Sequence, residues 1–499
     1  MKTLYERLEA YGRSDAYGFH MPGHKRNPEI ARRTGVNLPY EIDITEITGF
    51  DDLHHAEGII KEAEEEAARL YQSEESHFLI NGSTAGILIA ILGTTRRGDT
   101  ILVARNCHKS VYHAIELNGL HPVYLYPGYA SSEQMNTEVS VEDVEAALME
   151  QKEIRAVVIV SPTYDGVVSD IEAIAAAVHA KGIPLIVDEA HGAHFGFHPY
   201  FPNRALSLGA DLVINSLHKT LPSLTQTAII HMNGEIVDRE KVRRYLHMLQ
   251  SSSPSYVLMA SIDACIFLMK NDGRELFARY VVWLEETREK LKSLKCLKLI
   301  ETEHYDRSKI LISVADTELT SHELSRRLRE EYQLEMEMTA GKYILAMTSV
   351  GDTKEGLDRL AMALLEIDGT LIAEMANETD AAITGADSDT DANIGADANT
   401  GASTDTDADA DTIRKLPRAQ IVCNVEAARE LSGTFLSWQQ AVGHVALEYA
   451  YLYPPGCPLT VPGERVSQEV ADMLQWYYEQ GFDIEGLKRK REIEVWIDG

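Results

Sequence analysis

Short apolar segments alternate with helical patterns from about Ser76 to Ile230, and this alternation constrains the fold more than any other feature of the chain. Between the apolar segments lie helical patterns such as VEDVEAALMEQ and DIEAIAAAVHAKG. The expected buried strands cover residues 77–80, 100–104, 122–126, 156–160, 184–188, 211–215 and 227–231. Buried strands separated by helices predict an α/β fold, with a mostly parallel sheet covered by helices on both faces. Such sheets bind ligands at the carboxyl ends of their strands.

The rest of the chain predicts further units. From about Glu240 to Leu291 the pattern is helical, and one long helix could link two domains. KILISVAD, ELSRRLREEY, LEMEM and KYILAMTS then indicate a smaller α/β unit. We therefore expect a large domain with the N-terminal segment over residues 1–292, a small α/β domain over 293–375 and a C-terminal domain over 413–499.

An acidic segment of low complexity separates the last two units. Residues 376–412 consist almost wholly of Ala, Asp, Thr, Gly, Asn and Ser. Such a composition buries too little apolar surface to offset chain entropy, so we expect a disordered linker or insertion. The segment holds ten of the acids behind the net charge of −31, and the remaining −21 still argues against nucleic acid or an anionic membrane as partner.

Cellular location and metal content are predicted from features that the sequence lacks. The N-terminal sequence MKTLYERLEAYGRSDAYG has no apolar signal core, and runs such as AGILIAILG are too short to span a bilayer. The five cysteines are scattered and form no CxxC pair, so neither a disulfide framework nor a metal site is expected. These features predict a cytoplasmic protein.

Three polar motifs follow predicted strands. In HFLINGSTAG, Ser83 and Thr84 stand at a strand-to-helix turn, where free amides and hydroxyls suit a phosphate group. In PLIVDEAHGAHFG, Asp188 ends a strand and can hold a proton on a heteroaromatic nitrogen. In NSLHKTLPSLTQTA, Lys219 follows another strand and offers an amine. Each motif alone is commonplace, but together they meet the requirements of pyridoxal phosphate.

The motifs also resemble a known family. DEAHGAHFG, SLHKTLPSLTQTA, NGSTAG, RNCHKS, MPGHK and TGFDDLHHAEG are similar to the Orn/Lys/Arg decarboxylase family, above all to its shorter, Gram-positive-type members. The resemblance covers roughly residues 1–370 and resumes near Ala419, where YLYPPGCPLTVPGE matches the family's C-terminal pattern. It implies fold type I of the pyridoxal phosphate enzymes, the aspartate aminotransferase-like fold. The acidic segment departs from the family pattern.

The resemblance also implies roles for single residues. Lys219 would bind the cofactor covalently, Asp188 would pair with its ring nitrogen, and Ala190 and His108 would pack on the two ring faces. His191 would lie close to the ring, and it or Lys219 would act as general acid. The residues expected at the phosphate are Ser83, Thr84, Ser216 and His218.

The substrate is expected to be a basic amino acid, and its distal cation needs an acid. Asp51, Asp52 and Glu57, in TGFDDLHHAEG, are the candidates that the resemblance suggests. It also implies a homodimer or higher homo-oligomer with the active site at the interface, where Ser252 or Ser253 would reach the partner's phosphate.

The predicted activity is decarboxylation of arginine or lysine, with ornithine behind them, to agmatine or a diamine for polyamine supply. Two alternatives remain: an aminotransferase or another pyridoxal phosphate lyase on the same fold, and a catalytically dead regulatory homologue. A NAD-dependent enzyme is disfavoured because the expected GxGxxG turn is missing.

Overall fold

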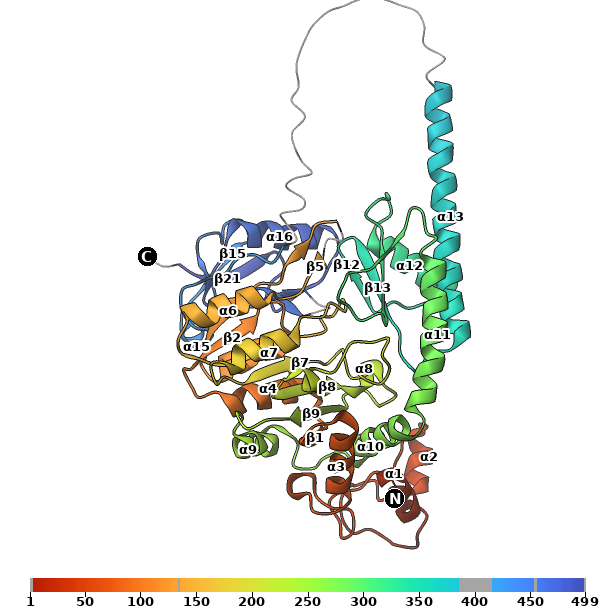
Figure 1. The fold of residues 1–499 in the computed structure, drawn as a ribbon, viewed down its shortest axis with the longest axis vertical. Helices are drawn as coiled ribbons and strands as arrows, with labels where there is room; N and C mark the ends of the chain where they lie inside the picture. The colour runs from red at the N-terminus through yellow and green to blue at the C-terminus, as the bar shows by residue number, and fades with distance from the viewer. Residues whose placement is uncertain (1–2, 133–134, 386–414, 453–455, 498–499) are drawn as a thin grey trace, which may run out of the picture.

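A computed structural model describes residues 3–132, 135–385, 415–452 and 456–497, with side chains omitted for 378–385. A seven-stranded sheet forms its centre (Figure 1). The strand order is β1-β9-β8-β7-β6-β2-β3. The strands are β1 (Glu75–Leu79), β2 (Thr100–Ala104), β3 (His121–Leu125), β6 (Ile154–Val160), β7 (Leu185–Asp188), β8 (Leu212–Ser216) and β9 (Ala228–Met232). They correspond to the seven predicted segments, so the predicted sheet is confirmed.

The direction of the strands decides where a ligand can bind. From β3 through β2, β6 and β7 to β8 every pair is parallel, whereas β9 runs antiparallel to both β8 and β1. Six strands therefore point the same way, and their carboxyl ends meet at one edge of the sheet. The polar residues that follow β1, β2, β7 and β8 are gathered there.

Helices flank this sheet, and their bounds follow local sequence signals. They are α3 (Ile59–Tyr71), α4 (Gly82–Thr94), α5 (Lys109–Leu117), α6 (Val141–Glu150), α7 (Ile171–His179) and the short α8 (Leu217–Thr220). Ser140 caps α6 and Asp170 caps α7 through their side chains, as is typical of helix starts. Gly86 lets α4 approach the sheet closely, because a Cβ there would lie 2.6 Å from Leu79 and 3.0 Å from Ile214.

The region after the sheet is helical, as the pattern predicted. It consists of three helices, α9 (Arg239–Leu249), α10 (Tyr256–Asn271) and α11 (Gly273–Leu291), and α11 is the long helix that leads into the next unit. The Ser-Ser-Ser-Pro run at residues 251–254 ends the first, and Ser255 caps the second. The expected domain boundary at residue 292 falls just after α11 ends.

A four-stranded antiparallel sheet follows, with order β10-β11-β13-β12. Its strands are β10 (Lys298–Ile300), β11 (Lys309–Ser313), β12 (Met338–Ala340) and β13 (Tyr343–Met347), and α12 (Ser321–Tyr332) packs on it. We call residues 296–347 the small unit. Helix α13 (Lys354–Gly385) runs alongside α11 and projects beyond the body of the protein (Figure 1).

Helix α13 extends past the expected start of the linker. The sequence LIAEMANETDAAIT contains neither Gly nor Pro and is rich in Ala, the best helix former, so the helix continues to Gly385 rather than ending near residue 375. Residues 386–412 of the expected linker lie outside the described residues.

The C-terminal unit, residues 415–497, has two small sheets and its own core around Trp438, Leu474 and Val495. Its strands are β14 (Gln420–Ile421), β15 (Thr434–Ser437), β16 (Val445–Ala446), β17 (Ala450–Leu452), β18 (Cys457–Thr460), β19 (Glu464–Arg465), β20 (Ile484–Glu485) and β21 (Glu492–Trp496). Its helices are α15 (Val425–Arg429) and α16 (Gln468–Glu479).

A buried ion pair joins this unit to the large sheet. Arg105, directly after β2, is fully buried and donates to both carboxylate oxygens of Glu464, at 2.7 and 2.9 Å. Its guanidinium also lies over the ring of Tyr124, 4.5 Å from the centroid.

The N-terminal segment lies at the opposite end of the protein from the C-terminal unit (Figure 1). It contains α1 (Leu4–Gly12), α2 (Pro28–Thr34) and the 3-10 helix η1 (Leu53–His55). The backbone N–H of Leu4 donates to Asp263 on α10 at 2.6 Å and fixes α1. No helix in the described ranges is both long and apolar enough to cross a membrane.

Candidate active site

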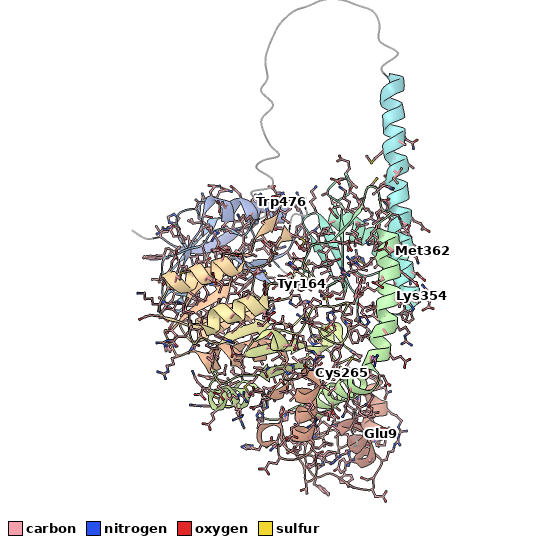
Figure 2. All side chains as sticks on the ribbon, in the orientation of Figure 1. Glu9, Tyr164, Cys265, Lys354, Met362 and Trp476 are labelled. Carbon is pink, nitrogen blue, oxygen red and sulfur yellow. The ribbon has the colours of Figure 1, made fainter. Side chains whose placement is uncertain are left out.

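The carboxyl ends of the strands open into one cavity of about 670 Å³. The large sheet, the small unit and the C-terminal unit all contribute to its wall, and Tyr164, labelled in Figure 2, lies near the centre of the protein between them. The predicted site residues in its lining are Ser83, Thr84, His108, Asp188, Ala190, His191, His218 and Lys219. Ser216 lies directly behind, and its hydroxyl donates to the Ser83 hydroxyl at 2.9 Å.

The start of α4 can receive an anion. Its N-cap residue, Asn81, makes no side-chain capping bond, and Gly82 has a positive φ of 76° that turns the chain into the helix. Because the first amides of a helix have no partners within it, they and the hydroxyls of Ser83 and Thr84 are donors for a bound phosphate. His218 is held beside this site by a 2.9 Å hydrogen bond between Nδ1 and the Thr227 carbonyl.

Asp188 places a carboxylate on the floor of the cavity. Its side chain sits at the end of β7 with only 5% of the residue exposed. The Ala190 N–H donates to Oδ1 at 3.2 Å. Burial raises the pKa of Asp188, and the positive charge of Lys219 only partly opposes the rise. A buried carboxylate in this setting is stabilised by a cationic partner.

His108 forms another part of the wall and caps α5. Its Nδ1 accepts from the Ser110 N–H at 3.2 Å and lies 2.9 Å from the Ser110 hydroxyl. Burial and the nearby charges of Lys219 and Lys109 lower the pKa of His108 to about 4. The imidazole is therefore neutral near pH 7, which suits a ring that stacks on another flat ring.

His191 connects two lysines. Its Nε2 lies 2.8 Å from Nζ of Lys219, and its Nδ1 lies 3.2 Å from Nζ of Lys309, on β11 of the small unit. Burial lowers the pKa of Lys219, although the carboxylates of Asp188 and Glu337 act in the opposite direction. The Tyr164 ring packs against the imidazole with centroids 4.5 Å apart.

Three predicted substrate acids lie elsewhere. Asp51 accepts backbone N–H groups at the start of α3, among them Gly58 at 2.8 Å and Ile60 at 3.0 Å. Asp52 caps η1 by accepting from the His54 N–H at 2.8 Å. Glu57 is exposed, and none of the three lines the 670 Å³ cavity of its own chain.

The same holds for the two serines expected to reach a partner's phosphate. Residues 252 and 253 are exposed and lie outside the cavity. They are close to the acidic loop, because His54 Nε2 contacts the Ser251 carbonyl at 2.8 Å. The predicted substrate segment and the serine run are thus adjacent to each other. The serine run borders the cavity in the same chain, because the Ser251 N–H donates to Oδ1 of the lining residue Asn81 at 3.3 Å.

Sequence reasoning missed several cavity residues, among them Glu337, Asp165 and Asn106, and it missed Lys309, which lies behind the lining residue His191. Glu337 accepts a hydrogen bond from the Tyr164 hydroxyl. Asn106 Oδ1 is buried with no hydrogen-bond partner among the described residues, so it is available to a ligand. Lys309 is the first residue of the apolar strand KILIS, a place where a lysine is commonly exposed, so the sequence did not mark it as buried. Within the described residues, no three His, Cys, Asp or Glu side chains are grouped to hold a metal ion.

The chain is similar to known proteins in sequence and in fold. The model of the Orn/Lys/Arg decarboxylase major domain matches residues 2–318, and that of the family's C-terminal domain matches residues 423–488. An arginine decarboxylase of Bacillus subtilis (strain 168) is 29% identical over 495 residues, covering 97% of this chain and 95% of the relative.

Solved structures share the fold. The Francisella novicida lysine decarboxylase LdcF superposes with a TM-score of 0.79 at 19% identity, covering 99% of this chain and 81% of its own. A structure of an SPT variant with pyridoxal phosphate (PLP) superposes with a TM-score of 0.51 at 17% identity, covering 62% of this chain and 76% of its own. The chain therefore shares its fold with the lysine decarboxylase over nearly its whole length, and with the SPT variant over about two thirds of it.

Proposed function

The chain belongs to the Orn/Lys/Arg decarboxylase family, and from this premise we propose that it is a PLP-dependent decarboxylase of a basic amino acid. Arginine and lysine are the favoured substrates, ahead of ornithine, and the products are carbon dioxide and agmatine or a diamine. The observation that carries the proposal is that the amine of Lys219, the carboxylate of Asp188 and the hydroxyl of Ser83 line one cavity.

The donors in the cavity fit the cofactor. The start of α4, with Ser83, Thr84, Ser216 and His218, would hold the phosphate group, and Lys219 would hold the aldehyde carbon. Asp188 would keep a proton on the ring nitrogen, where a buried ionic contact is much stronger than in water. The imidazole ring of His108 and the methyl group of Ala190 would enclose the flat cofactor ring. When bound, PLP supplies a ring that accepts the electron pair released by the departing carboxylate.

The chain's own groups then handle protons. Once carbon dioxide has left, the substrate's α-carbon needs a proton, and Nζ of Lys219 or Nε2 of His191 is the proposed donor. Positioned proton transfer of this kind typically contributes about 10²–10⁴-fold to the rate. The cavity wall from three units would exclude bulk water from this step.

We also propose Glu337 as the acid that binds the distal cation of the substrate. It lines the cavity, whereas Asp51, Asp52 and Glu57 of the same chain do not. The Tyr164 hydroxyl orients its carboxylate, and the charge of Glu337 acts on Lys219. In a dimer the three N-terminal acids would instead border the partner's cavity.

A homodimer or higher homo-oligomer is part of the proposal. Tyr17, Phe19 and Met21 are exposed to 70%, 92% and 58%, which is unusual for neighbouring large apolar side chains. Light scattering should therefore give at least twice the chain mass of 55.6 kDa. A monomeric mass at micromolar concentration would exclude the shared site.

Product analysis tests the function. Purified protein and PLP are incubated separately with arginine, lysine and ornithine, and the products are identified by mass spectrometry. We expect carbon dioxide and the matching amine from at least one substrate, and no turnover with Lys219→Ala. An oxo acid in place of the amine would mean an aminotransferase, and no product from any substrate would mean a regulatory homologue.

The same assay tests Glu337. Glu337→Gln keeps the shape but removes the charge, so KM should rise by about tenfold while kcat changes less, because a charged hydrogen bond is worth about 1.5–3 kcal/mol. An unchanged KM would assign the distal cation to another acid.

A further inference from the structure

The small unit sends a lysine into the interior beneath the proposed site. Lys309 is 0% exposed, and its aliphatic stem passes over Gly166. A Cβ on Gly166 would lie 2.7 Å from Lys309 Cγ, and the φ of +98° at Gly166 is one that other residues rarely adopt. The absence of a side chain at Gly166 therefore leaves room for the stem of Lys309. A lysine is almost never fully buried without a partner.

Hydrogen-bonding rules limit the protons that this group can hold. An ammonium group only donates, whereas a neutral imidazole has one donor and one acceptor nitrogen. Lys309 meets Nδ1 of His191 at 3.2 Å and Lys219 meets Nε2 at 2.8 Å. With a neutral ring, both hydrogen bonds can therefore exist only when the lysine that faces the ring N–H is a neutral amine. The other lysine donates to the ring and can be an ammonium, so the three groups together hold at most one extra proton.

The surroundings keep the ring neutral. Burial lowers the pKa of His191 well below its ordinary value, and the charges of Lys219 and Lys309 lower it further. Burial also lowers the pKa of Lys309 to about 8, against the opposing carboxylates. The other charged and titratable groups that act on these three side chains are Asp165, Asp188, Asp306, Glu337, His108 and His218.

We propose that Lys309, His191 and Lys219 form a proton relay that holds one extra proton, with Lys309 as the buried residue that restores a proton to Lys219. In the transfer, the N–H bond of the Lys309 ammonium breaks as Nδ1 of His191 gains that proton. At the same time the Nε2–H bond breaks and Nζ of Lys219 becomes an ammonium. The ring stays neutral, and the charge moves from one lysine to the other.

The relay deepens the proposed function, since it rests on Lys219 as the group that gives up a proton during turnover. Lys309 touches neither the expected cofactor nor the substrate and acts through His191, so it is a positioning residue. Because Lys309 is fully buried, the proton it returns comes from inside the protein rather than directly from bulk water.

The first test uses the cofactor-free protein. The reaction of the Lys219 amine with acetic anhydride is followed against pH by peptide mass spectrometry, in the wild type and in Lys309→Met. When Lys309 no longer competes for the shared proton, the apparent pKa of Lys219 should rise by about one unit, and its labelling near pH 7 should slow by about tenfold. An identical labelling profile in the two proteins would overturn the relay.

A second variant distinguishes proton transfer through Lys309 from a role in which Lys309 only orients the His191 ring. Lys309→Arg keeps a charged donor to Nδ1 but does not release a proton, since an arginine stays protonated. We expect labelling of Lys219 like that of the wild type, yet a kcat of the PLP-loaded enzyme lower by about 10²-fold. Full turnover in Lys309→Arg would overturn the relay and leave Lys309 with an orienting role.

Two controls complete the design. Lys292→Met replaces an exposed lysine and should change neither the labelling of Lys219 nor kcat. Circular dichroism and thermal melting establish that each variant is folded, and if the larger arginine prevents folding, the Lys309→Met labelling decides alone. Because labelling needs neither cofactor nor turnover, a negative product analysis with the wild type would refute the proposed function without affecting this measurement.

Discussion

At the scale of single residues, Asp188 offers a direct prediction about chemistry. Asp188→Asn preserves the shape of a buried side chain but removes the charge that would hold a proton on the cofactor ring. The loss of a buried ionic partner costs about 3–5 kcal/mol, so kcat should fall by about 10²–10⁴-fold. Steady-state kinetics at saturating PLP measure this. Asp170→Asn, at the start of α7 on the surface, should leave kcat unchanged; an equal loss in both variants would count against a role for Asp188.

A second residue-scale prediction concerns pH and stability. His77 lies 2.6 Å from Glu75 and 3.3 Å from Glu64, with 21% of its side chain exposed. Burial alone would lower the pKa of His77, but the two carboxylates raise it from 6.5 to about 9. Burial would likewise raise the pKa of Glu75, but His77 and Arg243 lower it to about 2.

A raised histidine pKa stabilises the folded protein at low pH. The contribution of His77 is complete below about pH 6.5 and disappears as the pH rises through about 9, while that of Glu75 is complete above its ordinary value of 4.5. His77→Gln should therefore lower the free energy of unfolding most near pH 5.5 and least above pH 9, as measured by urea denaturation. His121→Gln, on the surface, is the control. A loss that grew with pH would contradict the assignment.

The sequence predicted those site residues that lie near the end of a strand in the large sheet, and it did not predict those from other units. Asp188 ends β7, and Ser83 and Lys219 come shortly after β1 and β8. The carboxyl ends of these strands share one edge of the sheet, so the alternating pattern predicted that the three residues lie close together. Lys309 and Glu337 belong to the small unit, and no local sequence pattern predicts that this unit packs against the cavity. Their contribution is a matter of tertiary packing.

At the scale of elements, the position of α4 depends on Gly86. An added Cβ would meet Leu79 at 2.6 Å and Ile214 at 3.0 Å, so Gly86→Ala should force the helix from the sheet. We expect a loss of about 1–3 kcal/mol in the free energy of unfolding, measured by chemical denaturation, together with weaker PLP binding at the helix start.

Gly369→Ala is the matched control, because nothing lies within 4 Å of a Cβ there in α13. It should stabilise the protein by about 0.4–1 kcal/mol by reducing the freedom of the unfolded chain. Destabilisation by both substitutions would point to a general intolerance of alanine rather than to close packing of α4.

Elements were predicted well where burial fixed them. The central strands of the large sheet, such as β2, β7 and β8, are apolar on both faces, which leaves few alternatives. The helical region from α9 to α11 was less certain, because breaks at a serine run and at a single Asp-Gly step do not interrupt the apolar pattern. The end of α13 was predicted wrongly. The composition of residues 376–412 indicates that the segment cannot form a core, but it does not indicate where a helix that starts before the segment will end.

At the scale of the whole molecule, the buried pair of Arg105 and Glu464 carries the attachment of the C-terminal unit. Glu464→Gln would leave a buried guanidinium without a counter-charge, at a cost of about 3–5 kcal/mol. Limited proteolysis should then release the C-terminal unit earlier than in the wild type.

Glu426→Gln is the comparison, since its ion pair with Arg97 also joins the C-terminal unit to the large domain but is exposed. That substitution should cost at most about 1 kcal/mol. Similar proteolysis rates for the two variants would show that the buried pair does not hold the unit in place.

One consequence follows from the wall of the cavity, to which Asn81 near one end of the sequence and Cys457 near the other both contribute. During synthesis a ribosome produces the sheet long before the segment that closes over it. A nascent chain stalled after β9 would already contain Lys219 and would leave its amine exposed to the surrounding solution. The proposed site is therefore complete only after the C-terminal unit has been synthesised and has docked on the large sheet.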